Sequence, residues 1–248
     1  MADVLGWRKK FGILGPSTNT VVQPDFDDLR PAGVTNHYSR IVVDNANAIS
    51  DQSFMQGAWK ISDNTADAVR GVLTCDPDFL IMGMSAVTFF GGAKGAEKWQ
   101  ADIEDIAGLK VCTGSASLIA ALQTYGNVKN IAFISPYFPA ANAEVTRFLQ
   151  DYGYHIVRDK ALQCPSWTAI AEVTEDRMIR EFKALDGDDV DAFIQVGTNL
   201  SMIRLAAAAE LWLQKPVIAI NTATYWHGLR QNGINDKMVG FGRLMQEF

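Results

Sequence analysis

The sequence predicts an α/β protein of two pseudo-symmetric lobes, each a mostly parallel sheet flanked by helices, with a ligand site between them. Short apolar runs alternate with helical patterns along the chain, which is typical of βαβ units. In addition, the apolar run 79–82 ends at Gly83, and a similar run over 193–196 ends at Gly197. Unbroken short apolar runs are typical of strands buried on both faces. We therefore expect these two strand ends to face each other across one small-molecule site.

The first half of the chain supplies one set of these elements. We expect strands over 11–14, 34–43, 79–82 and 109–112, and helices over 45–74, 95–107 and 116–125. Apolar residues recur at helical spacing over 45–74, which predicts one long helix. The segment 23–29 is too short and acidic to predict more than a helical turn, and Ser115 is placed to cap the helix that follows it.

The second half repeats the pattern. We expect strands over 130–134, 154–158, 192–196 and 216–220, and helices over 140–152, 174–185, 201–213 and 223–231. Three units match in order between the halves: 11–16 with 131–136, the Gly83 unit with the Gly197 unit, and 111–117 with 218–224. Generic similarity between βα units is the alternative explanation. The matches predict a duplicated lobe, with residues 1–118 plus 224–248 in the first lobe and 119–223 in the second.

Composition excludes several classes of protein. The chain has 248 residues and a net charge of -6, which argues against a nucleic-acid groove or an anionic membrane surface as partner. No apolar run approaches the roughly 20 residues that a membrane span needs. The three cysteines form neither a disulfide framework nor a CxxC metal motif. The acidic run 186–191 lacks calcium-loop spacing. We expect a cytoplasmic protein without a metal or cofactor.

The predicted strand ends carry hydroxyl, amide and glycine residues and no carboxylate. Ligands of open α/β sheets lie beyond the carboxyl ends of the strands, and helix N-termini there favour anions. We therefore expect a site for a small carboxylic acid, although each residue on its own could be only a turn former or a helix cap. The predicted substrate-binding residues are Pro16, Ser17, Asn19, Gly83, Met84, Gly197, Asn199 and Thr222.

Four side chains are candidates for catalysis. Tyr137 and His227 could transfer protons, although Tyr137 could instead be a core residue and His227 a partly buried structural histidine. Ser85 and Thr198 lack an evident partner base, so we interpret them as hydrogen-bond donors to a carboxylate or an enolate. Aromatic residues that could form the apolar wall of the site, or belong to the core, are Phe89, Phe90, Tyr225 and Trp226.

Several short motifs resemble those of one family. Residues 82–85, Met-Gly-Met-Ser, look like the Met-Gly-Thr-Ser loop of arylmalonate decarboxylases. Residues 16–19 resemble the Pro-Ser-Ser-Asn turn of maleate isomerases, and residues 37–40 resemble their His-Ser-Ser-Arg segment. Pro136-Tyr137 matches the family's Tyr-bearing turn. The chain thus resembles the arylmalonate decarboxylase and maleate isomerase branch of the aspartate/glutamate racemase superfamily over nearly its whole length.

The resemblance implies two α/β lobes around a site that works without metal or organic cofactor. It also implies one or two catalytic cysteines, one per lobe, but Gly83 and Gly197 stand at the aligned positions. The expected activity is therefore that of a cofactor-independent decarboxylase or isomerase, acting on a small dicarboxylate or related acid through an enolate-like intermediate. The alternatives are a hydratase or hydrolase that activates water, and a non-catalytic carboxylate-binding protein. A homodimer is compatible with the resemblance.

Overall fold

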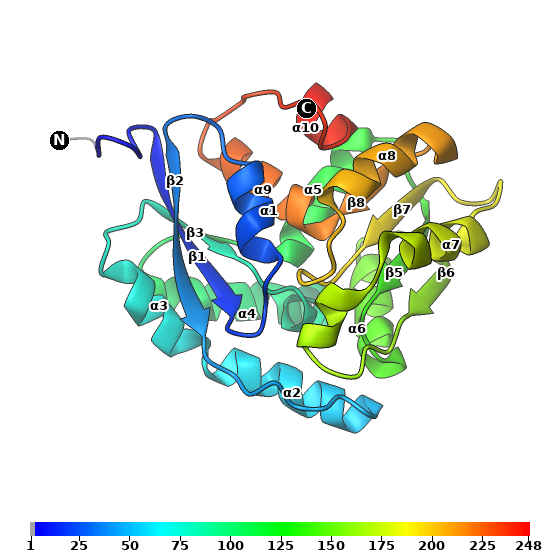
Figure 1. The fold of residues 1–248 in the computed structure, drawn as a ribbon, viewed down its shortest axis with the longest axis horizontal. Helices are drawn as coiled ribbons and strands as arrows, with labels where there is room; N and C mark the ends of the chain where they lie inside the picture. The colour runs from blue at the N-terminus through cyan, green and yellow to red at the C-terminus, as the bar shows by residue number, and fades with distance from the viewer. Residues whose placement is uncertain (1–2) are drawn as a thin grey trace.

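Two four-stranded parallel sheets form the centres of two lobes that lie side by side (Figure 1). The computed structural model describes residues 3–248. The first sheet has the order β2-β1-β3-β4 and the second the order β6-β5-β7-β8. The first sheet contains β1 (Lys9–Pro16), β2 (Val34–Ile41), β3 (Phe79–Met82) and β4 (Val111–Cys112). The second contains β5 (Asn130–Ser135), β6 (His155–Ala161), β7 (Ala192–Gln195) and β8 (Val217–Ala219).

The two sheets share one topology, in which the first strand of each lobe pairs with the second and the third. β1, β3 and β4 thus occupy the same places as β5, β7 and β8, which are the strands matched in the sequence. The prediction of two pseudo-symmetric lobes is confirmed. The residue boundaries given above for the lobes stay a prediction.

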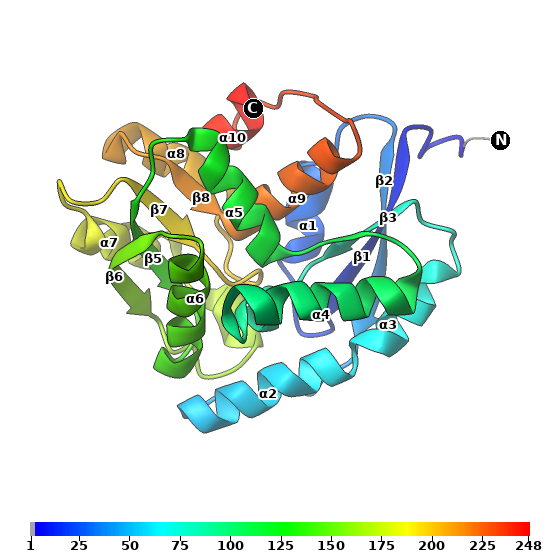
Figure 2. The same cartoon turned by 180° about the vertical axis from the view of Figure 1, so that it is seen from behind.

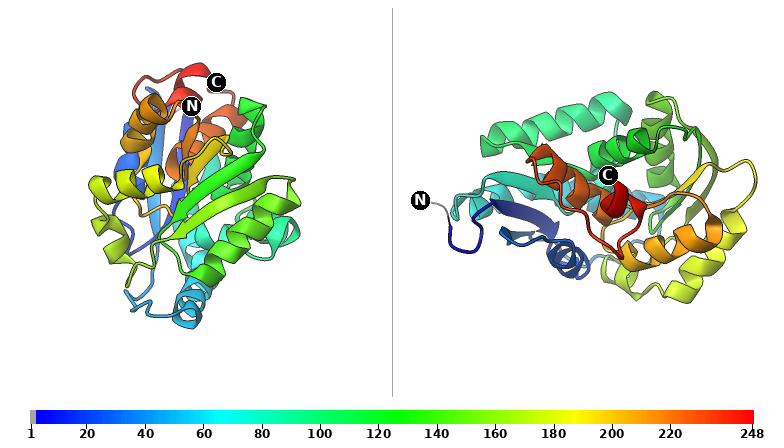
Figure 3. Two further views of the ribbon diagram at one scale, coloured as in Figure 1. Left: turned by 90° about the vertical axis from the view of Figure 1, so that its right-hand side faces the viewer. Right: turned by 90° about the horizontal axis from the view of Figure 1, so that it is seen from above.

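Helices flank both sheets (Figures 2 and 3). Those of the first half are α1 (Val22–Asp28), α2 (Asp51–Asp63), α3 (Thr65–Leu73), α4 (Gly92–Ala107) and α5 (Gly114–Tyr125), with a 3-10 turn η1 (Ala86–Phe89). Those of the second are α6 (Pro139–Asp151), α7 (Glu175–Leu185), α8 (Ile203–Leu213), α9 (Ile220–Gln231) and α10 (Arg243–Glu247), with η2 (Thr168–Glu172). Figure 2 shows α5 and α9 packed together in the middle of the molecule.

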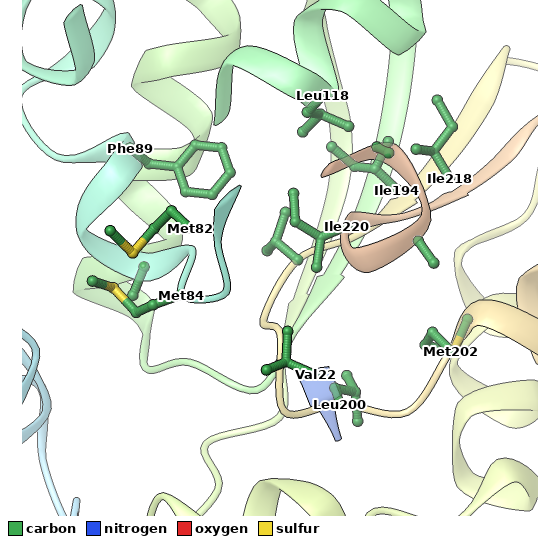
Figure 4. Close-up of a cluster of buried hydrophobic side chains, with 14 of the residues drawn as sticks. Val22, Met82, Met84, Phe89, Leu118, Ile194, Leu200, Met202, Ile218 and Ile220 are labelled. Atoms are coloured by element: carbon green, nitrogen blue, oxygen red, sulfur yellow. The ribbon is translucent and has the colours of Figure 1, made fainter. Parts of the chain in front are cut away.

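One apolar core runs through both lobes. Figure 4 shows part of it, where Met82 and Phe89 of the first lobe lie in the same cluster as Ile194 and Ile218 of the second. Burial of apolar side chains is the largest favourable term in folding. A core shared in this way fixes the two lobes against each other, and with them the strand ends between the lobes.

Three local predictions are wrong. Ser115 lies within α5 and does not cap it; the cap is Thr113, whose hydroxyl accepts from the Ala116 amide (3.4 Å). The single helix expected over 45–74 is two helices, α2 and α3, because the chain turns at Asn64, whose side-chain amide donates to the Val42 carbonyl (2.8 Å). The segment 23–29 lies largely within the regular helix α1. No helix in the described part of the chain is long and apolar enough to cross a membrane.

The segment before α2 links the lobes. The Ala48 amide donates to the Pro165 carbonyl (2.8 Å), and Asp51 accepts from the Ala140 amide at the start of α6 (2.6 Å). α2 then runs from the start of α6 back beneath the first lobe to α3 (Figure 1). α2 therefore lies along the boundary between the lobes, where it packs against α6 of one half and η1 of the other.

Candidate active site

A small pocket lies where the carboxyl ends of the two sheets meet. Its volume is about 50 Å³, which is room for about four water molecules. Eight predicted site residues line it: Pro16, Asn19, Met84, Ser85, Tyr137, Gly197, Thr198 and Asn199. Five further lining residues were missed from the sequence: Thr18, Ile61, Ala86, Trp167 and Ile170.

Thr198 joins the turns that follow β3 and β7. Its hydroxyl donates to the Gly83 carbonyl (3.0 Å) and accepts from the Asn19 side-chain amide (3.0 Å). The Gly197 amide donates to the Ser85 hydroxyl (3.2 Å) across the same boundary. The twin glycine turns are therefore in direct contact, one from each lobe.

Asn19 is held in place by the first backbone amides of α1 and by Arg40. Its side-chain oxygen accepts from the amides of Val21 and Val22 at the start of α1 (3.0 and 2.9 Å). Arg40 donates to the Asn19 carbonyl (2.8 Å). Both contacts leave the Asn19 side-chain NH₂ directed at Thr198, so this donor is set in place before any ligand arrives.

Ser85 and Tyr137 form a buried hydroxyl pair, with 2.8 Å between the two oxygen atoms. Tyr137 is only 3% exposed, and this burial raises the pKa of its phenol. Tyr137 is therefore a neutral hydrogen-bond donor at physiological pH, and a base only if a ligand changes its surroundings. The Phe54 ring packs against the Tyr137 ring, with 5.3 Å between the centroids.

Asn199 forms a second hydrogen-bonded contact between the lobes. Its side-chain oxygen accepts from the Thr20 amide (2.9 Å), and its NH₂ group donates to the Trp167 carbonyl (2.8 Å). Both ends of this buried side chain are therefore used within the protein. Asn199 holds the Trp167 backbone beside the pocket.

The opposite side of the pocket is apolar. Ile61 comes from α2, Trp167 and Ile170 come from the segment that contains η2, and Met84 precedes η1. The Phe54 ring supports Trp167, with 5.0 Å between the centroids. Of the two alternatives left open for Phe89, Phe90, Tyr225 and Trp226, the core is the one observed: all four are buried and none of them lines the pocket.

Four predicted site residues do not line the pocket. Ser17 exchanges hydrogen bonds with the backbone of Val43 at the surface. Gly83 contributes only its carbonyl to the network described above. Thr222 is buried, and its hydroxyl has no hydrogen-bond partner. His227 lies on α9 beside Ser117 (3.2 Å between Nδ1 and Oγ), and burial lowers its pKa.

None of the pocket-lining residues, all within the described range 3–248, is charged or is a cysteine. Cys112 is buried beside Ser117 and His227, and burial raises its pKa to about 12. Burial also raises the pKa of Cys164 to about 11. Within the same range, no group of three or more His, Cys, Asp or Glu side chains is placed to hold a metal ion.

Comparison with known proteins gives the family. A family model described as arylmalonate decarboxylase matches residues 45–245. A maleate isomerase of Pseudomonas putida is 24% identical over 251 residues, which cover 95% of this chain and 96% of the relative.

Solved structures match over nearly the full length of both chains. A maleate cis-trans isomerase mutant of Nocardia farcinica, with a covalently bound succinylcysteine intermediate, has a TM-score of 0.87 at 19% identity, covering 97% of this chain and 99% of that one. Unliganded arylmalonate decarboxylase has a TM-score of 0.76 at 19% identity, covering 96% of this chain and 98% of that one. Two lobes with parallel sheets are common to all of them. Since the family model spans most of its length, the chain belongs to the arylmalonate decarboxylase family.

Proposed function

We propose that this protein is a cofactor-independent enzyme that decarboxylates a small dicarboxylic acid of the malonate type through an enolate-like intermediate. One observation carries the proposal: the pocket combines neutral hydrogen-bond donors on one side with apolar side chains on the other, and no lining residue is a cysteine or carries a charge. The family contains decarboxylases and its relatives include isomerases, so the composition of the pocket has to decide between these reactions.

One carboxylate of the substrate would bind on the polar side. The hydroxyls of Ser85, Thr198 and Tyr137 and the Asn19 amide line that side. They form two pairs, Ser85 with Tyr137 and Asn19 with Thr198. A carboxylate would exchange these neutral contacts for charge-assisted hydrogen bonds, which are roughly twice as strong. The same donors would stabilise the negative charge that develops on this group when an enolate forms.

The second carboxylate would lie against Ile61, Trp167 and Ile170. An apolar surrounding disfavours a charged group that has no partner. When the bond between this carboxylate and the α-carbon breaks, neutral carbon dioxide leaves and the electron pair passes to the enolate of the first carboxylate. A proton then returns to the α-carbon from the Ser85–Tyr137 pair, which solvent reprotonates. His227, predicted to be catalytic, lies too far into α9 to line the pocket and has no step here.

Isomerisation through a thiol is disfavoured by the two glycines. The Nocardia farcinica relative carries a succinylcysteine intermediate, whereas Gly83 and Gly197 stand at the positions that we aligned with the family's cysteines. Gly197 has a φ of +102°, and a Cβ atom there would lie 2.5 Å from Pro136 Cγ. A Cβ atom on Gly83 would lie 3.1 Å from the Leu14 carbonyl oxygen. The backbone at Gly197 is therefore fitted to glycine, whereas a side chain at Gly83 would require its neighbours to shift slightly.

Incubation with candidate acids in D₂O, followed by NMR, tests the proposal. Malonate, methylmalonate, maleate and phenylmalonate would first be screened by thermal shift. Deuterium at the α-carbon together with release of carbon dioxide supports decarboxylation. Conversion of maleate to fumarate would instead support an isomerase, and oxygen-18 uptake from water would support a hydratase or hydrolase. Binding without turnover would identify a non-catalytic carboxylate-binding protein, and the absence of any binding would refute the site itself.

A further inference from the structure

A buried carboxyl group lies directly behind the pocket and takes no part in the chemistry proposed above. Asp25, on α1, is 7% exposed. Its carboxylate accepts from the side-chain NH₂ of Asn221, the second residue of α9 (2.8 Å). The same NH₂ group donates to the Thr198 carbonyl (3.0 Å). One amide therefore connects a titratable group to the turn that lines the pocket.

Asn221 makes this bridge at a structural cost. Its side-chain oxygen is buried and has no hydrogen-bond partner. A buried polar atom without a partner is unfavourable, and an apolar side chain of similar size would avoid it. The two bonds donated by its NH₂ group are thus the contacts that account for an asparagine at this place.

Thr198 is held from both sides as a result. Asn221 fixes its backbone carbonyl, and Asn19 donates to its side-chain hydroxyl. Asn19 in turn accepts from the first amides of α1, the helix that carries Asp25. A change at Asp25 therefore reaches the Gly197–Thr198 turn through Asn221 and by way of α1.

The charged neighbours of Asp25 are few. Asp28 on the same helix acts to keep it protonated, and Arg204 on α8 acts in the opposite direction and pairs with Asp28 (3.1 Å). From α9 the nearby titratable group is Tyr225, whose ring packs on Phe26 and whose hydroxyl donates to Asn36. From β2, Tyr38 and Arg40 bind Gln23 of α1. Burial outweighs these charges and raises the pKa of Asp25 to about 6.

We propose that Asp25 is a positioning residue: its ionised carboxylate, acting through Asn221, holds the Gly197–Thr198 turn in the conformation that binds an acid. The ligand in this proposal, a carboxylic acid, is taken from the proposed function, on which the proposal therefore rests. Protonation on acidification replaces a charge-assisted hydrogen bond with a weaker neutral one. The turn then loosens, and affinity for a carboxylate falls as the pH falls through about 6.

An NMR titration without ligand tests the connection itself. In a ¹⁵N-labelled sample, the Thr198 amide signal should move with a midpoint near pH 6 in the native protein. In Asp25→Asn and in Asn221→Leu this movement should disappear. Asp28→Asn is the matched control on the same helix, where the movement should remain and shift to lower pH because Asp28 favours the protonated form of Asp25. A Thr198 signal that titrates equally in native protein and Asp25→Asn would overturn the proposal.

Malonate affinity across the same pH range tests the consequence. On going from about pH 7.5 to pH 5, native protein should lose about fivefold more affinity than Asp25→Asn, because protonation of malonate itself affects both proteins alike. Equal pH dependence in both proteins would overturn the positioning role. If no acid binds at any pH while the Thr198 titration behaves as expected, the proposed function fails and the connection between Asp25 and the turn stands. Asp25→Asn is isosteric, so the test does not depend on whether Asn221→Leu folds.

Discussion

Replacing Tyr137 by Phe removes one hydroxyl from the pocket and leaves the ring in place. The ring keeps its contact with Phe54, and the Ser85 hydroxyl keeps its hydrogen bond from the Gly197 amide. The only hydrogen bond lost is the 2.8 Å contact between the two hydroxyls. The substitution is therefore a local probe of whether this phenol acts on a ligand or only supports the fold.

The expected effects on stability and on rate differ in size. Loss of one buried neutral hydrogen bond lowers the free energy of unfolding by about 0.5–1.5 kcal/mol. Loss of one donor to a developing oxyanion lowers kcat by about 100-fold or more, which corresponds to about 3 kcal/mol of transition-state stabilisation. Because burial raises the pKa of Tyr137, the rate loss should be the same at every pH where the native enzyme is folded and active.

The assay is release of carbon dioxide from malonate or the best acid of the screen, together with urea unfolding of each variant. Tyr225→Phe is the matched control, because Tyr225 is fully buried and loses one hydrogen bond, to Asn36, without lining the pocket. The control should lose similar stability and keep its rate. Full activity in Tyr137→Phe, or an equal rate loss in both variants, would refute the catalytic role of Tyr137.

Three further substitutions test other parts of the site. Trp167→Leu should improve kcat/KM for phenylmalonate relative to malonate by about tenfold, since Trp167 separates the pocket from a hollow of about 320 Å³; an unchanged ratio would show that Trp167 does not set substrate size. Gly197→Ala should lower the free energy of unfolding by about 2–5 kcal/mol, because the backbone there is strained for alanine and the new Cβ atom overlaps Pro136. The control is Gly153→Ala, which is also at positive φ but has open space around it; its free energy of unfolding should fall by about 1 kcal/mol. Asp25→Asn should be more stable than native protein at about pH 7.5 by up to about 3 kcal/mol, with the difference vanishing toward pH 4 in urea titrations, because the unfolded chain ionises near 3.8 while the folded group holds its proton to about 6.

The sequence alone predicts the succession of strands and helices along the chain and the turns at the strand ends. Local patterns suffice for this, because a buried strand, a glycine turn and a helix follow one another within about 20 residues. The contact between the Gly83 and Gly197 turns follows from the duplication. These turns follow β3 and β7, which occupy matching places in the two sheets, and the carboxyl ends of both sheets face the boundary between the lobes. Eight of the residues proposed for substrate binding or catalysis lie in the pocket for this reason.

The sequence does not predict the apolar side of the pocket or the place of Thr222. Ile61 and Trp167 meet across the boundary of the lobes, and no local pattern relates a residue of α2 to one before η2. Thr222 was expected in a turn, but α9 begins at Ile220, directly after a strand of three residues. Within a helical first turn, successive side chains point about 100° apart. Asn221 therefore reaches Thr198, and Thr222 points elsewhere.

The distribution of charge around the pocket favours decarboxylation for a reason independent of the missing thiols. A dicarboxylate in a neutral, partly apolar pocket keeps both charges at close quarters, and isomerisation would keep them through every step. Decarboxylation moves the charge of the second carboxylate away from the apolar side, because carbon dioxide leaves neutral and its electron pair passes to the enolate among the hydrogen-bond donors, so the pocket would stabilise the transition state more than the bound substrate. Asp25 does not line the pocket, and its carboxylate accepts from Asn221, which also donates to the Thr198 carbonyl. We therefore expect a cation placed in the pocket, as in Ile170→Lys, to strengthen malonate binding while slowing its decarboxylation.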